Sequence, residues 1–219
     1  MRYRILFAVA ALVACKIREG RKVTASLNPA DSMALSQAAD SLEALYHRLH
    51  SGSHNERPDS DQAAVAAAWR RADRRIADVT ARTVNSPVRD WLVGDVYYAA
   101  WDLDMPNAFD SAESHLSRSL TLDSAFFPPR LSLARLYVNS GPGLAAKGER
   151  LLREARVPPG SAEDAKVHEG LAFALAFQGR AHEAAAEAAL LLAHDSTNQV
   201  MRMMRDAYGR NHAAGDRHK

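Results

Sequence analysis

Three histidines spaced three and four residues apart, His47, His50 and His54, are the closest approach of this sequence to a metal-binding motif. Imidazole is a common transition-metal ligand, and residues three or four apart share one face of a helix. A zinc site needs three or four ligands on a fixed frame, however, and His54 falls in the polar, breaker-rich stretch 51–58. We expect a solvated helix end at these histidines and no metal site in the chain.

The sequence contains no recognised catalytic motif. It lacks a glycine-rich phosphate loop, a Gly-x-Ser-x-Gly nucleophile turn, a His-Glu-x-x-His zinc motif and a Cys-x-x-Cys-His haem motif. Acidic residues at scattered helical positions predict solvated faces rather than paired catalytic carboxylates, among them Glu149, Glu154, Glu183 and Glu187. We expect no enzymatic activity and no small-molecule cofactor. A hydrolase would require acidic side chains gathered in one concavity.

Five arginines crowd one short stretch, with two aspartates between them. The arginines are Arg70, Arg71, Arg74, Arg75 and Arg82, and the aspartates are Asp73 and Asp78. Such a pattern is typical of a solvated helix face with local ion pairs, but it would also attract anionic lipid headgroups or an acidic partner. The net charge of +2 over 219 residues gives no support to nucleic-acid binding.

The first 15 residues have the character of an export signal. Two arginines precede an apolar run over 5–14, which is much shorter than the roughly 20 residues that a transmembrane helix needs. Its end, Leu12-Val13-Ala14-Cys15, resembles the lipobox of bacterial lipoproteins, and Cys15 is the only cysteine. The resemblance implies a signal peptide over 1–14, a covalent lipid on Cys15 and a flexible tether over 15–28. The alternative is a plain signal peptide with a chance cysteine.

The composition favours an all-α fold, because 42 alanines accompany only 11 glycines, 9 prolines and few strand formers. Apolar residues at helical spacing predict a helix over 31–50, capped by Asp31 or Ser32, and a second helix over 61–85. These two helices would form an N-terminal hairpin over 29–85. Ser86-Pro87 predicts the start of the next helix.

The remainder of the chain repeats itself. Residues 108–124 align with residues 180–196 at an offset of 72, which brings Ala112 onto Ala184, and Gly148 lies 36 residues from each. These units resemble tetratricopeptide repeats, which are paired helices with small residues at their contacts.

The resemblance implies turns at Asn107 and Gly179, with a middle turn lengthened by Gly141-Pro142-Gly143. The predicted fold is all-α: a short α-solenoid of about three such hairpins over 86–210, ending in a capping helix. Residues 211–219 are expected to form a disordered tail.

Proteins with such repeats usually bind ligands in the concave groove lined by the first helix of each hairpin. The same register here implies a partner-binding groove lined by Tyr97, Trp101, Asp104, Leu131, Arg135, Asn139, Lys166, Glu169, Phe173 and Phe177. Aromatic residues and arginine are favoured at interface hot spots. A register error of one residue would exchange groove for core, so a core role for Trp101 and Phe173 stays open.

Two functions of different classes fit these patterns. The first is a membrane-anchored lipoprotein of the bacterial cell envelope that faces the periplasm and binds a protein or peptide in its groove, as an interaction adaptor or assembly factor. The alternative is a structural accessory subunit, held in a larger envelope complex through its outer helix faces and its arginine-rich helix. Lys16 follows the lipobox cysteine, which favours the outer over the inner membrane by the rule known for enteric bacteria.

Overall fold

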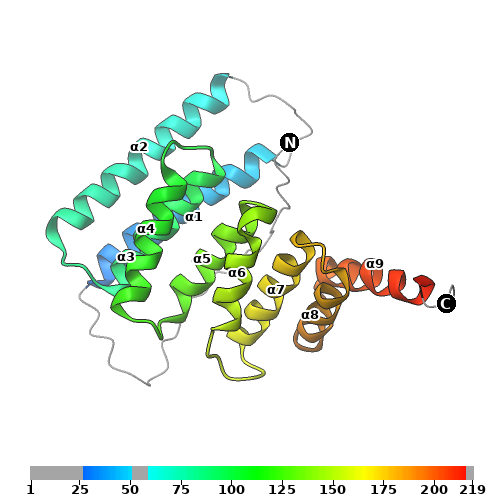
Figure 1. Ribbon diagram of the computed structural model, residues 1–219. Helices are drawn as coiled ribbons and strands as arrows, with labels where there is room; N and C mark the ends of the chain where they lie inside the picture. The colour runs from blue at the N-terminus through cyan, green and yellow to red at the C-terminus, as the bar shows by residue number, and fades with distance from the viewer. Residues whose placement is uncertain (1–26, 51–58, 216–219) are drawn as a thin grey trace.

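The computed structural model describes residues 27–50 and 59–215, and within these ranges every regular element is an α-helix (Figure 1). The nine described helices are α1 (Pro29–His50), α2 (Asp59–Arg82), α3 (Pro87–Asp102), α4 (Ala108–Leu122), α5 (Phe127–Asn139), α6 (Pro142–Arg153), α7 (Ala162–Phe177), α8 (Ala181–His194) and α9 (Gln199–Gly215). The predicted all-α class is therefore confirmed. The expected signal peptide, Cys15, most of the tether and His54 lie outside the described residues.

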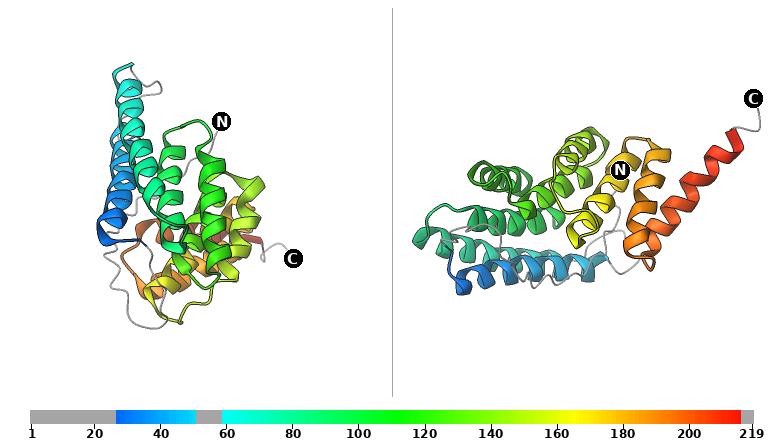
Figure 2. Two further views of the ribbon diagram at one scale, coloured as in Figure 1. Left: turned by 90° about the vertical axis from the view of Figure 1, so that its left-hand side faces the viewer. Right: turned by 90° about the horizontal axis from the view of Figure 1, so that it is seen from below.

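From α3 onward the helices pack mainly against their neighbours in the chain, from the pair α3 and α4 through to the pair α8 and α9. Figures 1 and 2 show α1 and α2 at one end of this row and α9 projecting from the other. Three contacts reach further along the chain: α1 packs on α3, and α5 contacts both α3 and α7. None of the helices described is both long enough and apolar enough to cross a bilayer.

The helix starts follow capping chemistry, with one correction. Ser86 caps α3 as predicted, because its hydroxyl accepts a hydrogen bond from the Arg89 amide at 3.2 Å. At α1 the cap is Asn28 rather than Asp31 or Ser32, since Asn28 Oδ1 accepts from the Asp31 amide at 2.9 Å. Asp31 is instead buried and pairs with Arg82 at the end of α2, so it joins the two helices of the N-terminal hairpin.

The turns inside the helix pairs depend on left-handed backbone. Asn107 has φ of 60° and Gly179 has φ of 74°, which confirms both predicted turns. The middle turn is not lengthened, because Pro142 already occupies the first turn of α6 and only Ser140 and Gly141 separate α5 from α6. Helix α9 continues to Gly215, five residues past the predicted end of the repeat domain.

Small residues permit the close approach of paired helices. Ala112, Ala134 and Ala184 are completely buried at these contacts. At Gly148 on α6, an added Cβ would lie 2.7 Å from Val138 Cγ2 and 2.8 Å from the Ala134 carbonyl oxygen, both on α5. The second of these atoms is backbone, so α6 has no room for a methyl group at this point.

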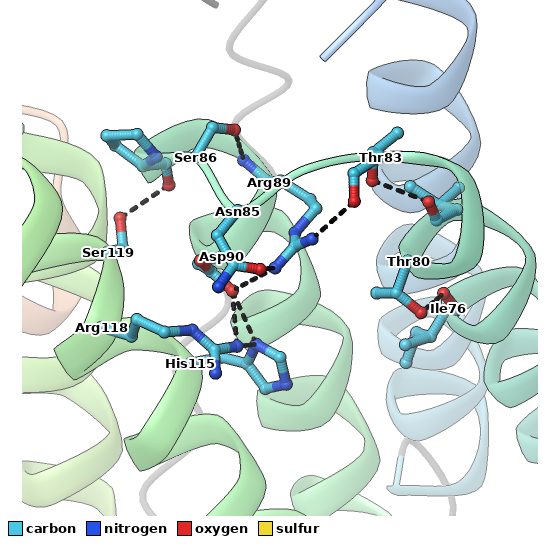
Figure 3. Close-up of polar contacts among 12 residues, drawn as sticks. Ile76, Thr80, Thr83, Asn85, Ser86, Arg89, Asp90, His115, Arg118 and Ser119 are labelled. Atoms are coloured by element: carbon cyan, nitrogen blue, oxygen red, sulfur yellow. Dashed lines mark hydrogen bonds and ion pairs between the residues drawn. The ribbon is translucent and has the colours of Figure 1, made fainter. Parts of the chain in front are cut away.

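A buried carboxylate joins α3 to α4 (Figure 3). Asp90 is 0% exposed, and its Oδ1 accepts from Arg118 Nη2 at 2.6 Å and lies 3.0 Å from His115 Nδ1. Arg89, which is also buried, lies beside it with Nη2 at 3.3 Å. Burial alone would raise the pKa of Asp90, but the hydrogen bonds from His115 and Arg118 and the charges of the two arginines hold that pKa well below its usual range.

The same group fastens the segment that enters α3. Arg89 Nη1 donates to the Thr83 carbonyl at 3.0 Å, and its Nη2 donates to Asn85 Oδ1. Across the helix pair, Ser119 Oγ donates to the Pro87 carbonyl at 2.7 Å. These bonds fix the start of α3 relative to both α2 and α4 (Figure 3).

We expect Gly148→Ala to lower the free energy of unfolding by about 1 to 2 kcal/mol, because overpacking against the Ala134 carbonyl outweighs the higher helix propensity of alanine. Gly143→Ala in the same helix is the matched control, since a Cβ there meets nothing within 4 Å. Urea unfolding followed by circular dichroism measures both. Equal urea midpoints for the two variants would contradict the close approach of α6 to the Ala134 carbonyl oxygen.

We expect Asp90→Asn to lower the free energy of unfolding at pH 7 by about 3 kcal/mol, because Arg89 is left in the interior without its anionic partner. The carboxylate contributes stability above its unfolded pKa of 3.8, and this contribution is lost as pH falls through the lower pKa of the folded state. The difference between the two proteins should therefore shrink below about pH 4. The exposed Asp73→Asn should change stability by less than about 0.5 kcal/mol, and an Asp90→Asn loss no greater than that would disprove the role of Asp90.

Candidate functional site

A pocket of about 230 Å³ lies between α1, α3 and α5. Helices α3 and α5 are the first helices of the first two predicted repeat pairs, and α1 forms the opposite wall because it packs on α3. The pocket is lined by Ala39, Asp40, Glu43, Tyr46, His47, Asp95, Tyr98, Ala99, Trp101, Asp102, Ser132, Arg135 and Asn139.

The pocket has an aromatic side built from α3. The rings of Tyr98 and Trp101 are stacked with their centroids 6.1 Å apart, and Trp101 packs edge-on against Phe109 of α4. Asn139 of α5 donates from Nδ2 to the Tyr98 hydroxyl oxygen at 2.7 Å, which fixes the phenol relative to α5. Burial raises the pKa of Tyr98, and the charge of Asp102 raises it further, so the phenol stays neutral.

Carboxylates outnumber cations in the pocket. Among the described residues, four acidic side chains line it, whereas the basic side chains are Arg135 and His47. Arg135 is also shared, because its Nη2 lies 3.3 Å from Glu169 Oε2 on α7. The acidic residues are Asp40, Glu43, Asp95 and Asp102, of which Asp40 and Glu43 are exposed. The pocket therefore presents net negative charge beside aromatic rings.

The surroundings of Asp95 strongly perturb its carboxyl group. Burial raises its pKa to about 7, although Ser132, Arg135 and Trp91 each act to lower it, and the charge of Glu43 raises it further. Its Oδ1 is buried and accepts no hydrogen bond from the described residues. A buried acceptor without a donor is costly, so the carboxyl group holds its proton to neutral pH.

Four of the ten predicted groove residues belong to this region. Trp101, Arg135 and Asn139 line the pocket, and Glu169 is joined to it through Arg135. Trp101 also packs against the hydrophobic core on one side, so groove and core roles coincide in this residue.

The other six predicted groove residues lie elsewhere. Leu131 and Phe173 are buried in the core, and Tyr97 turns to the far side of α3, where it stacks on His115 and packs against Trp69 of α2. Asp104 is exposed in the turn after α3, with φ of 61°. Lys166 and Phe177 are half-buried on α7, and neither lines the pocket.

The sequence patterns did not predict the four acidic residues of the pocket or the wall that α1 forms. On α3 they selected Tyr97 where the structure places Tyr98, which is the register error of one residue that the pattern left open. A usable signal was Asp95, an ionisable residue inside the otherwise apolar run from Leu92 to Val96. The α1 wall carried no signal, because nothing in the sequence showed on which helix α1 packs.

Apart from His47, which also lines the pocket, His50 and the α2 arginines singled out in the sequence take structural or surface positions. His47 lies 3.6 Å from Glu43, and His50 Nδ1 lies 2.8 Å from the Tyr46 carbonyl oxygen. All five arginines on α2 are exposed; Arg82 pairs with Asp31, and the other four lie on the outer face of the helix. These four are Arg70, Arg71, Arg74 and Arg75.

One expected solvated residue proves to be buried. Glu149 on α6 is 8% exposed, because its carboxylate accepts from Arg153, Gln178 and Arg180 and so joins α6 to the end of α7. Burial alone would raise the pKa of Glu149, but these three hydrogen bonds hold it below its usual range. It is a structural anchor rather than part of the pocket.

No known protein family model, curated protein or solved structure matches this chain. The assignment of function therefore depends on the site itself.

We expect the stability of the protein to fall as pH rises from about 4 to 7, because the folded state keeps the Asp95 proton in this window while the unfolded chain, with a pKa of 3.8, has lost it. Asp95→Asn removes this proton, so its stability relative to the natural chain should grow by about 2 kcal/mol between pH 5 and pH 8. Urea unfolding at both pH values measures the difference. A pH-independent difference, like that expected for the exposed Asp73→Asn, would show that Asp95 is an ordinary carboxylate.

Proposed function

We propose that this protein is a lipid-anchored adaptor of the bacterial cell envelope, which binds a partner protein or peptide through the pocket between α1, α3 and α5. The partner segment carries a lysine or arginine side chain that enters the pocket. The observation that carries this proposal is the combination of four acidic residues with the Tyr98 and Trp101 rings in one concavity. Carboxylates and aromatic faces both attract organic cations, and together they favour lysine and arginine over neutral side chains.

The arrangement of helices supports a groove that extends beyond the pocket. Helices α3, α5 and α7 contact one another in order, and the bridge from Arg135 to Glu169 continues the polar surface from α5 to α7. This order is the one expected if the three helix pairs form a tetratricopeptide-like solenoid, in which the first helices line the concave side. A peptide lying across these helices would meet the acidic pocket at the end covered by α1.

The location follows from the sequence. We infer that Cys15 carries the lipid, that residues 15–28 form the tether and that the helical region faces the periplasm, with the outer membrane favoured. Two or more acyl chains anchor a protein stably, since each buried methylene contributes about 0.8 kcal/mol.

A hydrolase is the second candidate, and one observation favours it: acidic side chains do gather in one concavity, and Asp95 has a pKa of about 7, as a general acid requires. Binding is the better supported function, because Asp95 Oδ1 is buried, whereas a general acid has to reach the atom that it protonates. Glycoside turnover by the natural chain that disappears in Asp95→Asn would reverse this preference.

The experiment is site-specific photo-crosslinking of the full chain in living cells. A photoreactive amino acid in place of Asp40, which is exposed at the pocket, should give a discrete adduct with an envelope protein. We expect Glu43→Lys to lower the yield at least tenfold, because it reverses an exposed charge at the pocket where the cationic side chain enters. Asp73→Lys, an equivalent reversal on α2, should leave the yield unchanged.

The outcomes separate the two binding roles. An adduct from position 40 that survives Glu43→Lys would overturn the acidic pocket as the recognition site. Stoichiometric adducts from positions on the exposed arginine face of α2, with none from position 40, would instead favour the accessory subunit.

A further inference from the structure

A second cluster of side chains, far along the chain from the pocket, has the chemistry of a metal site. Asp164 lies in the first turn of α7, His168 lies one turn later, and His194 is the last residue of α8. One ligand atom from each of the three residues falls within 4.8 Å of the others. We propose that Asp164, His168 and His194 bind one Zn²⁺ ion.

The distances fit an ion better than they fit direct pairing. His168 Nε2 lies 3.7 Å from Asp164 Oδ1, and His194 Nε2 lies 3.8 Å from Asp164 Oδ2. Both separations exceed a hydrogen bond. Two ligands of a tetrahedral zinc ion, each roughly 2.1 Å from it, are about 3.4 Å apart. The three ligand atoms lie within 4.8 Å of one another, so side-chain movements of about 1 Å would bring them to the separations of a zinc site.

A hydrogen bond outside the cluster prepares His168 for this role. Its Nδ1 lies 2.7 Å from Glu187 Oε2 on α8, so the imidazole donates its proton to that carboxylate. The lone pair of the neutral ring is then on Nε2, which is the atom directed at Asp164. A carboxylate that holds the other nitrogen of a histidine is the usual support of a zinc ligand, because it fixes both tautomer and ring orientation.

Asp164 and the backbone complete the frame. The Gly160 amide donates to Asp164 Oδ2 at 2.8 Å, and Ser161 caps the helix from which the carboxylate projects. Asp164 and His168 have side chains 18% and 19% exposed, and His194 is 28% exposed, so an ion has a path from solvent to a partly enclosed site.

Two imidazoles and one carboxylate favour Zn²⁺ and neighbouring transition ions over Ca²⁺ and Mg²⁺, which prefer oxygen ligands throughout. Three protein ligands leave one position open on a tetrahedral ion, for water or for a donor group from another molecule. The ion would join the start of α7 to the end of α8, so it would close the last helix pair before α9.

The test is Co²⁺ titration of the full chain in detergent, because four-coordinate Co²⁺ reports zinc sites by its visible absorption. Every protein carries Cys15→Ser, so that the only thiol does not compete for the ion. We expect one Co²⁺ per chain, displaced by Zn²⁺, and a Zn²⁺-dependent rise in melting temperature. His194→Gln should weaken binding at least a hundredfold, and Glu187→Gln, which keeps all three ligands, should weaken it about 10- to 100-fold.

The control is His182→Gln, which removes an exposed histidine from the first turn of the same helix and should leave binding unchanged. His194 is a helix-end residue, so His194→Gln is expected to fold, and its circular dichroism without metal verifies this. Absence of a one-to-one Co²⁺ spectrum in the parent chain would overturn the proposal. Equal Co²⁺ affinity of the parent and the His194→Gln protein would also overturn it.

Discussion

The close contact of paired helices through small residues is the constraint on which this structure depends. Where Gly148 meets the Ala134 carbonyl oxygen, α5 and α6 approach until backbone lies against backbone. Completely buried alanines occupy corresponding contacts in the other pairs, at Ala112 and Ala184. Because the two helices of a pair lie close together, the first helix of one pair can contact the first helix of the next. Helices α3, α5 and α7 therefore pack side by side in one row. The pocket exists because α1 then packs on one end of that row.

Two buried carboxyl groups on α3 show how the surroundings decide the state of an acid. Asp90 and Asp95 are five residues apart on one helix, and burial acts to raise both pKa values. Asp90 faces Arg118 and His115, so it stays charged and ties α3 to α4. Asp95 Oδ1 receives no hydrogen bond from the described part of the chain and faces a pocket with other carboxylates, so Asp95 keeps a proton. The first group is a charged structural anchor, whereas the second is a neutral acid in the lining of the pocket.

The sequence predicted what depends on local chemistry. Alanine content and helical spacing predicted an all-α chain, Ser86-Pro87 predicted a helix start, and Asn107 and Gly179 predicted turns. It failed where the answer depends on which helices meet. Tyr97 and Tyr98 are adjacent and chemically identical, and only the packing of α2 and α4 against one side of α3 decides that Tyr98 faces the pocket. The sequence pattern places Glu149 on a solvated face, but in the structure Arg180 and Gln178, just after the end of α7, donate hydrogen bonds to its carboxylate.

The contact between α1 and α3 also makes the two ends of the row of helices differ in their resistance to local unfolding. It joins segments separated by the whole of α2, whereas α9 is held by contacts with its immediate predecessor α8. Stacked helices of this kind unfold in cooperative units from their weakest end. The α9 end is therefore the natural starting point for fraying, and amide hydrogen exchange should be fastest there and slowest at the α3–α4 junction. Because α3 lines the pocket, we expect the pocket to lie in the part of the molecule that opens last.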